Sequence, residues 1–324
     1  MEILNLTISQ MLMMFTLVII GYILTKTKII PDNADKTIAK IATFVFAPAL
    51  NFRSLLSNCT VENFSRDYKL ILYGLGFILV AILLSYLLCG LFVRKASGNP
   101  ERAYKKNIYK YAIAIANFGF LGNFLVLEMF GDEMLYKYIM FTFFPTFFVY
   151  AWGLTILIPK KENASNGKFA FLKNLINPGV ISVVAGCICG LLGLNKYMPG
   201  FLDKALVNLG NNCMGPAGML LTGVVIGKYD IKTLWADKKV YIATVLRLLI
   251  IPALFALLTK AIGGGEELMI FTVMLFGTPF GLNTIVFPAA YGGETKTGAA
   301  MALISSILAI ITMPLLYYIF LTLL

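Results

Sequence analysis

The chain has 324 residues, of which 59% are hydrophobic and 13% are charged, and its formal net charge is +11. Soluble proteins carry about 25% charged residues, so this composition excludes a soluble fold and indicates that the apolar surface faces lipid. Because the sequence has no histidine, it contains neither a Ser-His-Asp triad nor a histidine proton relay, and we expect no enzyme.

Ten apolar stretches follow one another along the chain, separated by turn and charge clusters such as residues 95–100. Each is long enough to cross a membrane, which takes about 20 residues. They predict an all-α polytopic membrane protein with short loops. The N-terminus lacks the basic region and cleavage pattern of a signal peptide, so we expect the first stretch to remain as a span. The predicted spans are 4–25, 35–57, 69–93, 106–130, 134–158, 172–194, 202–227, 238–261, 267–291 and 298–323.

Basic residues predict the orientation of these spans, because cytoplasmic loops are enriched in Lys and Arg. Counted with the adjoining helix ends, the loops after odd-numbered spans hold 19 Lys and Arg, and the loops after even-numbered spans hold 7, while Arg247 lies inside span eight. We therefore expect the odd loops in the cytoplasm, both termini outside, and a multi-pass protein of the cell inner (cytoplasmic) membrane. The charges are spread over many loops, which argues against nucleic-acid binding.

The ten spans divide into two sets of five, residues 1–158 and 172–324, joined by a cytoplasmic linker at 159–171. An odd number of spans in each half inverts the second half relative to the first, and such inverted repeats are typical of secondary transporters. The halves share motifs in matching order, which are Ala47-Pro48-Ala49-Leu50 with Gly215-Pro216-Ala217-Gly218, and Phe130-Gly131-Asp132-Glu133 with Tyr291-Gly292-Gly293-Glu294.

Spans four and nine are predicted to break near their middle, at residues 117–123 and 277–284. Glycine and asparagine favour leaving a helix, and proline removes a backbone donor. Broken backbone survives in a membrane only against protein or a water-filled cavity. Two half-helix N-termini that face one cavity would form an anion site without any arginine. The alternative is that these are packing kinks, since Gly and Pro are frequent in membrane helices.

The candidate substrate-binding residues lie at the two breaks and in span seven. For the two asparagines of span seven, solvation near a loop is an equally good interpretation. The set is Asn117, Gly119, Gly122, Asn123, Asn211, Asn212, Thr278, Pro279, Asn283 and Thr284.

Three charged residues are candidates for a coupling or a structural role. Arg247 lies between Leu246 and Leu248 in span eight, where an arginine is a functional candidate, with pairing to a carbonyl or carboxylate as the structural alternative. Arg53 is expected to extend towards the outer headgroups. Glu128 lies near the end of span four.

Metal sites and cofactors are not expected. The five cysteines form no C-x-x-C pair, so we interpret them as small apolar residues. No P-loop motif is present, which argues against ATP-driven transport by this chain. Gly186-x-x-x-Gly190 and Gly223-x-x-x-Gly227 indicate close helix packing and leave dimerisation open.

At several motifs the chain resembles the auxin efflux carrier family, whose bacterial members are often described as malate or malonate permeases. The motifs are residues 117–122, 209–217 with Gly223, 278–292, and Met313-Pro314, and the resemblance covers nearly the whole chain. It implies two inverted five-helix repeats with crossing broken helices 4 and 9. It also implies a scaffold of helices 1, 2, 6 and 7 beside a mobile transport domain, commonly in a homodimer with elevator-like motion. The family commonly has proline where this chain has Asn123, so we expect the first break to depend on glycine.

These features predict a secondary transporter for small organic anions such as carboxylates, with alternating access around the helix 4 and helix 9 crossing. Coupling to a proton or sodium, or uniport, stays open. The main alternative is a channel or a transporter-like membrane sensor for the same ligands. A lipid-modifying membrane enzyme is the weaker alternative, because the spans offer no convergent acids, histidines or metal ligands.

Overall fold

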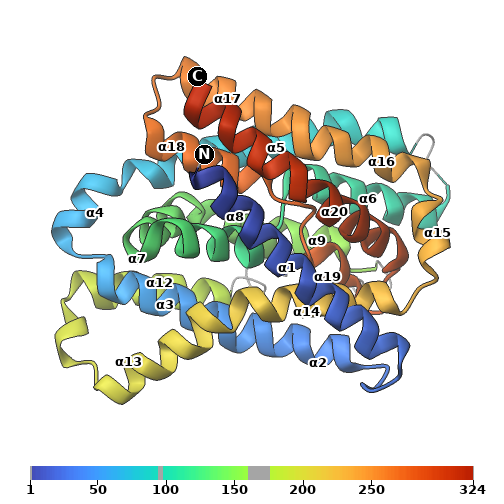
Figure 1. Ribbon diagram of the computed structural model, residues 1–324. Coiled ribbons are helices and arrows are strands. Elements are labelled where there is room, and N and C mark those ends of the chain that lie inside the picture. Colours follow the sequence, from blue (N-terminus) through green and yellow to red (C-terminus); the bar gives the residue numbers. More distant parts are fainter. Residues whose placement is uncertain (1, 94–97, 160–175, 324) are drawn as a thin grey trace.

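The computed structural model describes residues 2–93, 98–159 and 176–323 (Figure 1). Within these ranges the regular structure is helical, and the one β feature is an isolated antiparallel bridge between Ala116 and Phe280. The predicted all-α class is therefore confirmed for the described part of the chain. The predicted linker, residues 159–171, lies outside the described residues except for Pro159.

The first half of the chain contains both long helices and helices interrupted by π-helical turns. The helices are α1 (Glu2–Lys26), α2 (Ala34–Ile41), α3 (Ala47–Asn58), α4 (Val61–Asp67), α5 (Lys69–Phe92), α6 (Pro100–Ala114), α7 (Asn123–Phe141), α8 (Phe143–Phe148) and α9 (Leu154–Leu157), with π-helical segments at Ala42–Phe46, Phe118–Gly122 and Val149–Gly153. Inside α7 the backbone turns at Gly131, whose φ of 80° is a conformation that favours glycine.

The second half also combines helices with π-helical segments. Its helices are α12 (Pro178–Leu191), α13 (Gly200–Val207), α14 (Met214–Gly227), α15 (Ile231–Trp235), α16 (Lys238–Val245), α17 (Ile251–Ala261), α18 (Glu266–Gly277), α19 (Asn283–Ala290) and α20 (Lys296–Tyr318). A 3₁₀ turn lies at Leu194–Tyr197, and π-helical segments lie at Asn208–Asn212, Leu246–Ile250 and Ile319–Leu323.

Four helical stretches of the described chain are long and apolar enough to cross a membrane: Ile8–Lys26, Lys69–Phe92, Lys238–Ala261 and Lys296–Leu321. A fifth results if Phe118–Phe141 and Phe143–Leu157, which meet at 57°, form one broken span. The outer face of α5 carries Leu72, Leu83 and Leu87, each at least 59% exposed, as expected of a lipid-facing surface. A multi-pass membrane protein is thereby supported, and the count of ten spans stays a prediction.

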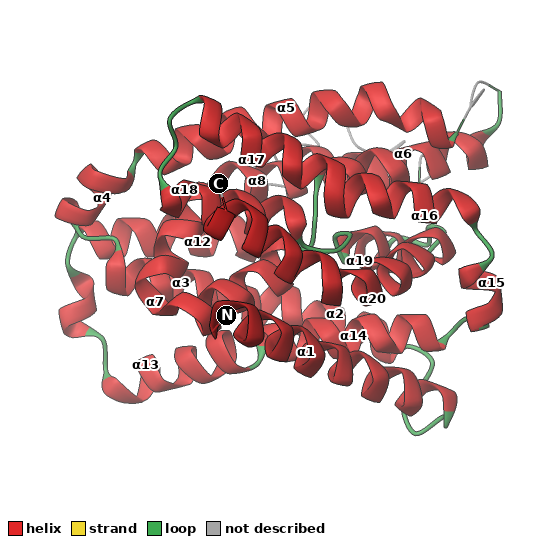
Figure 2. Ribbon diagram, turned by 45° about the horizontal axis from the view of Figure 1, so that its top comes forward, coloured by secondary structure: helices red, strands yellow, loops and turns green. Residues whose placement is uncertain are grey.

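The helices form two layers that flank the broken segments and also meet directly, where α20 packs against α1 and α14 (Figure 1). In Figure 1, α1 runs diagonally across the front and packs along α14, and α12 packs along α3 in the lower part, while in the upper part α5 packs on α6 and α17 on α18. The turned view in Figure 2 shows α5, α6 and α17 in its upper part and α1, α13 and α14 in its lower part. We call α1, α2, α3, α12, α13 and α14 the first layer, and α5, α6, α16, α17, α18 and α20 the second layer.

The two G-x-x-x-G motifs act within the first layer. A Cβ at Gly223 would overlap the carbonyl oxygen of Val18 in α1, and a Cβ at Gly186 would lie 2.9 Å from the carbonyl oxygen of Phe52 in α3. The close packing predicted from these motifs is confirmed inside the chain. Dimerisation stays a prediction.

Candidate functional site at the crossing of two broken helices

The first break separates α6 from α7. Helix α6 ends at Ala114, and Ile115 is extended, with φ −121° and ψ 121°. The chain becomes helical again at Phe118, where the carbonyl oxygen of Asn117 accepts the N–H groups of Leu121 and Gly122 at 3.0 and 3.1 Å. The break therefore lies just before the predicted segment 117–123. Asn123 and both predicted glycines lie within the following helix, so this break does not depend on glycine.

The second break separates α18 from α19. Thr278 is extended, with φ −67° and ψ 154°, because a residue before proline disfavours the helical conformation. Pro279, Phe280, Gly281 and Leu282 then connect to Asn283, where α19 begins. A Cβ at Gly281 would lie 3.0 Å from the carbonyl oxygen of Ala116, which is tighter than an ordinary contact, so this close approach favours glycine.

The two breaks lie directly against each other. The N–H of Asn117 donates to the carbonyl oxygen of Pro279 at 2.9 Å, and Ala116 pairs with Phe280 in the antiparallel bridge. Four half-helix ends meet here: the C-termini of α6 and α18, and the N-termini of the 118–130 helix and of α19. The predicted crossing of the two broken helices is thus present as a backbone contact.

A cavity of about 60 Å³ lies beside the crossing. It is small compared with typical ligand pockets of about 300–1,000 Å³, so a solute larger than a few atoms requires its walls to move apart. Acidic and basic side chains are absent from the described residues that line it. Its polar lining residues are Thr43, Asn51, Asn117, Asn123, Thr146, Tyr150 and Asn283.

Two buried amides in this lining have unused hydrogen-bonding capacity. Asn117 and Asn123 are 5% and 6% exposed, and their Oδ1 atoms have no hydrogen-bond partner among the described residues. Asn283 differs, because its Nδ2 donates to the hydroxyl of Tyr111 at 3.0 Å. A buried polar atom without a partner costs about 1–3 kcal/mol, and a polar ligand in the cavity would remove that cost.

Of the ten predicted binding residues, Asn117, Gly119, Asn123 and Asn283 line the cavity. Four others shape the breaks. Gly122 lies against the Tyr138 hydroxyl, Thr278 and Pro279 end α18, and Thr284 Oγ1 donates to the carbonyl oxygen of Gly281 at 2.8 Å.

Asn211 and Asn212 do not line the cavity. Asn211 Nδ2 donates to Asp132 Oδ1 at 3.3 Å, and the exposed Asn212 donates to Asn208 Oδ1 at 3.1 Å. Asp132 also pairs with Arg53 at 2.5 Å, and Arg53 lies 3.4 Å from Asp203. Arg53 therefore bonds carboxylates rather than extending freely, and Asn211 belongs to this ion-pair cluster.

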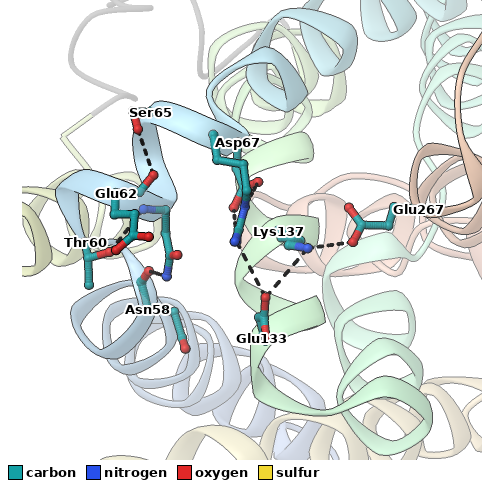
Figure 3. A network of polar contacts seen from close by, with 10 residues as sticks. Asn58, Thr60, Glu62, Ser65, Asp67, Glu133, Lys137 and Glu267 are labelled. Atoms are coloured by element: carbon teal, nitrogen blue, oxygen red, sulfur yellow. Dashed lines mark hydrogen bonds and ion pairs between the residues drawn. The ribbon is translucent and has the colours of Figure 1, made fainter.

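A second ion-pair cluster includes Glu133, the residue that directly follows Asp132 in the chain. Lys137 of α7 lies between Glu133 and Glu267, at 3.7 and 2.6 Å (Figure 3). Arg66 of α4 pairs with Asp67 and reaches Glu133 at 3.5 Å. Glu128, the predicted coupling acid, is exposed and is in neither the cavity lining nor these ion pairs.

Arg247 is completely buried and contacts backbone at the crossing. Its Nη1 donates to the carbonyl oxygen of Ile113 at 3.0 Å, and its Nη2 donates to that of Leu275 at 3.3 Å. Of the two interpretations offered by the sequence, the structure shows the pairing with carbonyl oxygens.

The binding set predicted from the sequence lacks several lining residues. Thr43 and Asn51 come from the α2–α3 segment, and Thr146 and Tyr150 come from the α8–α9 segment. Asn51 carries a signal, as an amide within an apolar span, where such amides line cavities or bond neighbouring helices. Thr43, Thr146 and Tyr150 carry none, because such residues are ordinary in membrane helices.

The family of the chain follows from a comparison of its whole length. Comparison with curated proteins gave no match. The family model described as "Membrane transport protein" matches residues 6–317, which is nearly the entire sequence and includes both breaks. This is the family of the auxin efflux carriers, as the motifs at the breaks indicated, and the chain belongs to it.

Proposed function

We propose that this protein is a secondary transporter for small organic anions such as carboxylates, and that it binds its solute at the crossing. The observation that carries this proposal is the convergence of two helix N-termini and two buried amides, whose Oδ1 atoms have no partner among the described residues, on one cavity without charged side chains. Membership of a membrane transport family supports the general activity.

The electrostatics of the crossing favour an anion. A helix N-terminus carries a partial charge of roughly +0.5, so two of them supply about one positive charge without a basic side chain. Free N–H groups at such ends bind carboxylates and phosphates. Rotation of the Asn117 and Asn123 amides by half a turn would place their Nδ2 donors where the unpartnered Oδ1 atoms now lie, and these donors could then bind a carboxylate. Cations would find no acidic side chain among the described residues that line the cavity.

The two layers give the proposed carrier a way to alternate its access. Gly215 and Gly218 of α14 lie against the rings of Phe124 and Phe120, so the first layer meets the 118–130 helix through small residues. We propose that the broken helices and the second layer move as one body along this contact, as in an elevator. The Arg53–Asp132 pair joins the first layer to α7 and has to break during that motion.

The proposed topology is ten spans in two inverted halves, with both termini outside. Both ends of the described chain lie in the left half of Figure 1, opposite α15, which supports an even number of crossings. The excess of basic residues in the odd loops supports the orientation.

Uptake of labelled malonate, malate and acetate by proteoliposomes tests the function. We expect saturable uptake and counterflow, and a large loss of both with Asn117→Ala combined with Asn283→Ala. Asn195→Ala, which changes an exposed asparagine in the 3₁₀ turn, serves as the matched control. Current without counterflow would indicate a channel. If no carboxylate is taken up, or the double variant transports normally, the proposal is wrong.

A further inference from the structure

The buried guanidinium of Arg247 joins the two half-helices that end at the crossing. Arg247 lies in the π-helical segment Leu246–Ile250 and is 0% exposed. Its two terminal nitrogens donate to carbonyl oxygens in the last turns of α6 and α18, at Ile113 and Leu275. One side chain therefore satisfies one free carbonyl oxygen in the last turn of each helix that stops at the breaks, while its buried Nε has no partner among the described residues.

The charge of Arg247 is balanced by backbone dipoles. None of the described carboxylates pairs with it, although an isolated buried charge is very unfavourable. Each helix C-terminus carries roughly −0.5 charge, so the two ends supply about −1. This matches a single guanidinium. The ring of Phe276, 5.8 Å from the guanidinium carbon, adds a weaker cation–π contact.

In transporters with broken helices, carbonyl oxygens at half-helix C-termini and in unwound backbone commonly coordinate a sodium ion. Here two such carbonyl oxygens already accept hydrogen bonds from Arg247. We propose that Arg247 is the resident cation of the crossing, and that it fills with a side chain the position that a coupling sodium ion would otherwise take. Sodium is then not needed at the crossing for the anion to bind.

This inference deepens the proposed function, on which its meaning for coupling rests. It makes Arg247 a positioning residue. By neutralising the two C-terminal ends, Arg247 leaves the positive field of the two N-termini uncancelled at the cavity. By bonding both helices, it also holds them at the distance at which Asn117 and Pro279 form their hydrogen bond.

Chemical rescue of the purified protein in detergent tests the assignment, with the melting temperature as the readout. The variants are Arg247→Ala, Arg247→Met and Arg247→Lys, with Arg102→Ala, at an exposed position in α6, as the control. Each is measured in choline chloride, with sodium chloride, and with millimolar guanidinium chloride, which is far below denaturing concentrations.

We expect Arg247→Ala and Arg247→Met to melt several degrees below wild type. The melting temperature of Arg247→Lys should lie between those of the two neutral variants and that of wild type. Guanidinium should raise the melting temperature of Arg247→Ala and should not raise that of wild type or of Arg102→Ala. Replacing choline by sodium should not change the melting temperature of wild type. This should hold both without a carboxylate and in its presence. A merely space-filling arginine would not show rescue by its own head group.

The assignment is overturned if Arg247→Met melts like wild type, or if guanidinium stabilises wild type as much as Arg247→Ala. It is also overturned if the carboxylate stabilises wild type only with sodium. If the neutral variants cannot be purified, recovery of folded Arg247→Lys supports the assignment. If Arg247→Lys cannot be purified in folded form either, the assignment is overturned. The guanidinium arms need no transported solute, so a failure of carboxylate uptake leaves their result intact.

Discussion

The N–H of Asn117 donates to the carbonyl oxygen of Pro279 at 2.9 Å, which joins two segments that lie 162 residues apart in the sequence. The bond joins the break in one helix to the break in another. A backbone group left free at one break is thus hydrogen-bonded by a backbone group at the other. Inside a membrane, backbone groups need such partners within the protein. We expect the shape of the cavity to depend on this contact.

Gly281→Ala should loosen the crossing. The added Cβ would lie 3.0 Å from the carbonyl oxygen of Ala116 and 3.1 Å from that of Ile115, and neither backbone atom can move aside cheaply. Overpacking of this kind costs about 1–3 kcal/mol, so we expect a lower melting temperature and reduced uptake. Gly76→Ala in α5, where nothing lies within 4 Å, is the matched control. Equal melting of the two variants would contradict the close approach.

Much of this crossing was predictable from local chemistry. Proline at 279 forces Thr278 out of the helix, and the amides and glycines at 117–123 mark the first break to within two residues. The all-helical class follows from composition, because so apolar a chain has to satisfy its backbone inside the membrane.

The rest depends on contacts that leave no sequence signal. The partners of Arg247 are backbone carbonyl oxygens, which every residue has. The sequence around Arg247 therefore could not distinguish a coupling charge from a structural one. Thr43 and Tyr150 reach the cavity only because distant helices pack side by side. Asn211 is an amide in an apolar span like Asn51, yet it faces Asp132 rather than the cavity.

Asp132→Asn should make it easier for the layers to separate at the Asp132 end. The carboxylate of Asp132 pairs with Arg53 and accepts a hydrogen bond from Asn211. A partly exposed pair of this kind is worth up to about 1 kcal/mol, so the open state should become roughly fivefold more populated. A hydrophilic thiol reagent should then react faster with a cysteine introduced at Asn123, in a chain whose native cysteines are replaced. Glu133→Gln is the control. Equal labelling of both variants would argue that the Asp132–Arg53 pair does not hold the two layers together.

Cys59 and Cys187 should form a disulfide without loss of transport. Their Sγ atoms lie 3.2 Å apart. Cys59 lies at the end of α3 and Cys187 lies in α12, and both helices belong to the first layer. An oxidant such as diamide would take up the two thiol hydrogens as the S–S bond forms. Because the bridge lies within one layer, it should leave uptake unchanged, whereas a bridge between Gly218→Cys and Phe120→Cys should stop uptake until it is reduced. Mass spectrometry checks each bridge, and loss of uptake with the first one would contradict motion between the layers.

Asn117→Asp should abolish binding of a carboxylate at neutral pH. The new carboxylate would stand beside the N-terminus of the 118–130 helix and occupy the positive field that the solute is proposed to use. Like charges in one buried cavity repel each other strongly, so we expect affinity to fall by at least about tenfold, which is 1.4 kcal/mol. Acidification that protonates the new carboxyl should restore part of the affinity, whereas wild type and Asn195→Asp should show no such recovery. Binding measured by thermal shift across pH separates these outcomes. Unchanged affinity at neutral pH would mean that the solute does not bind at this helix end.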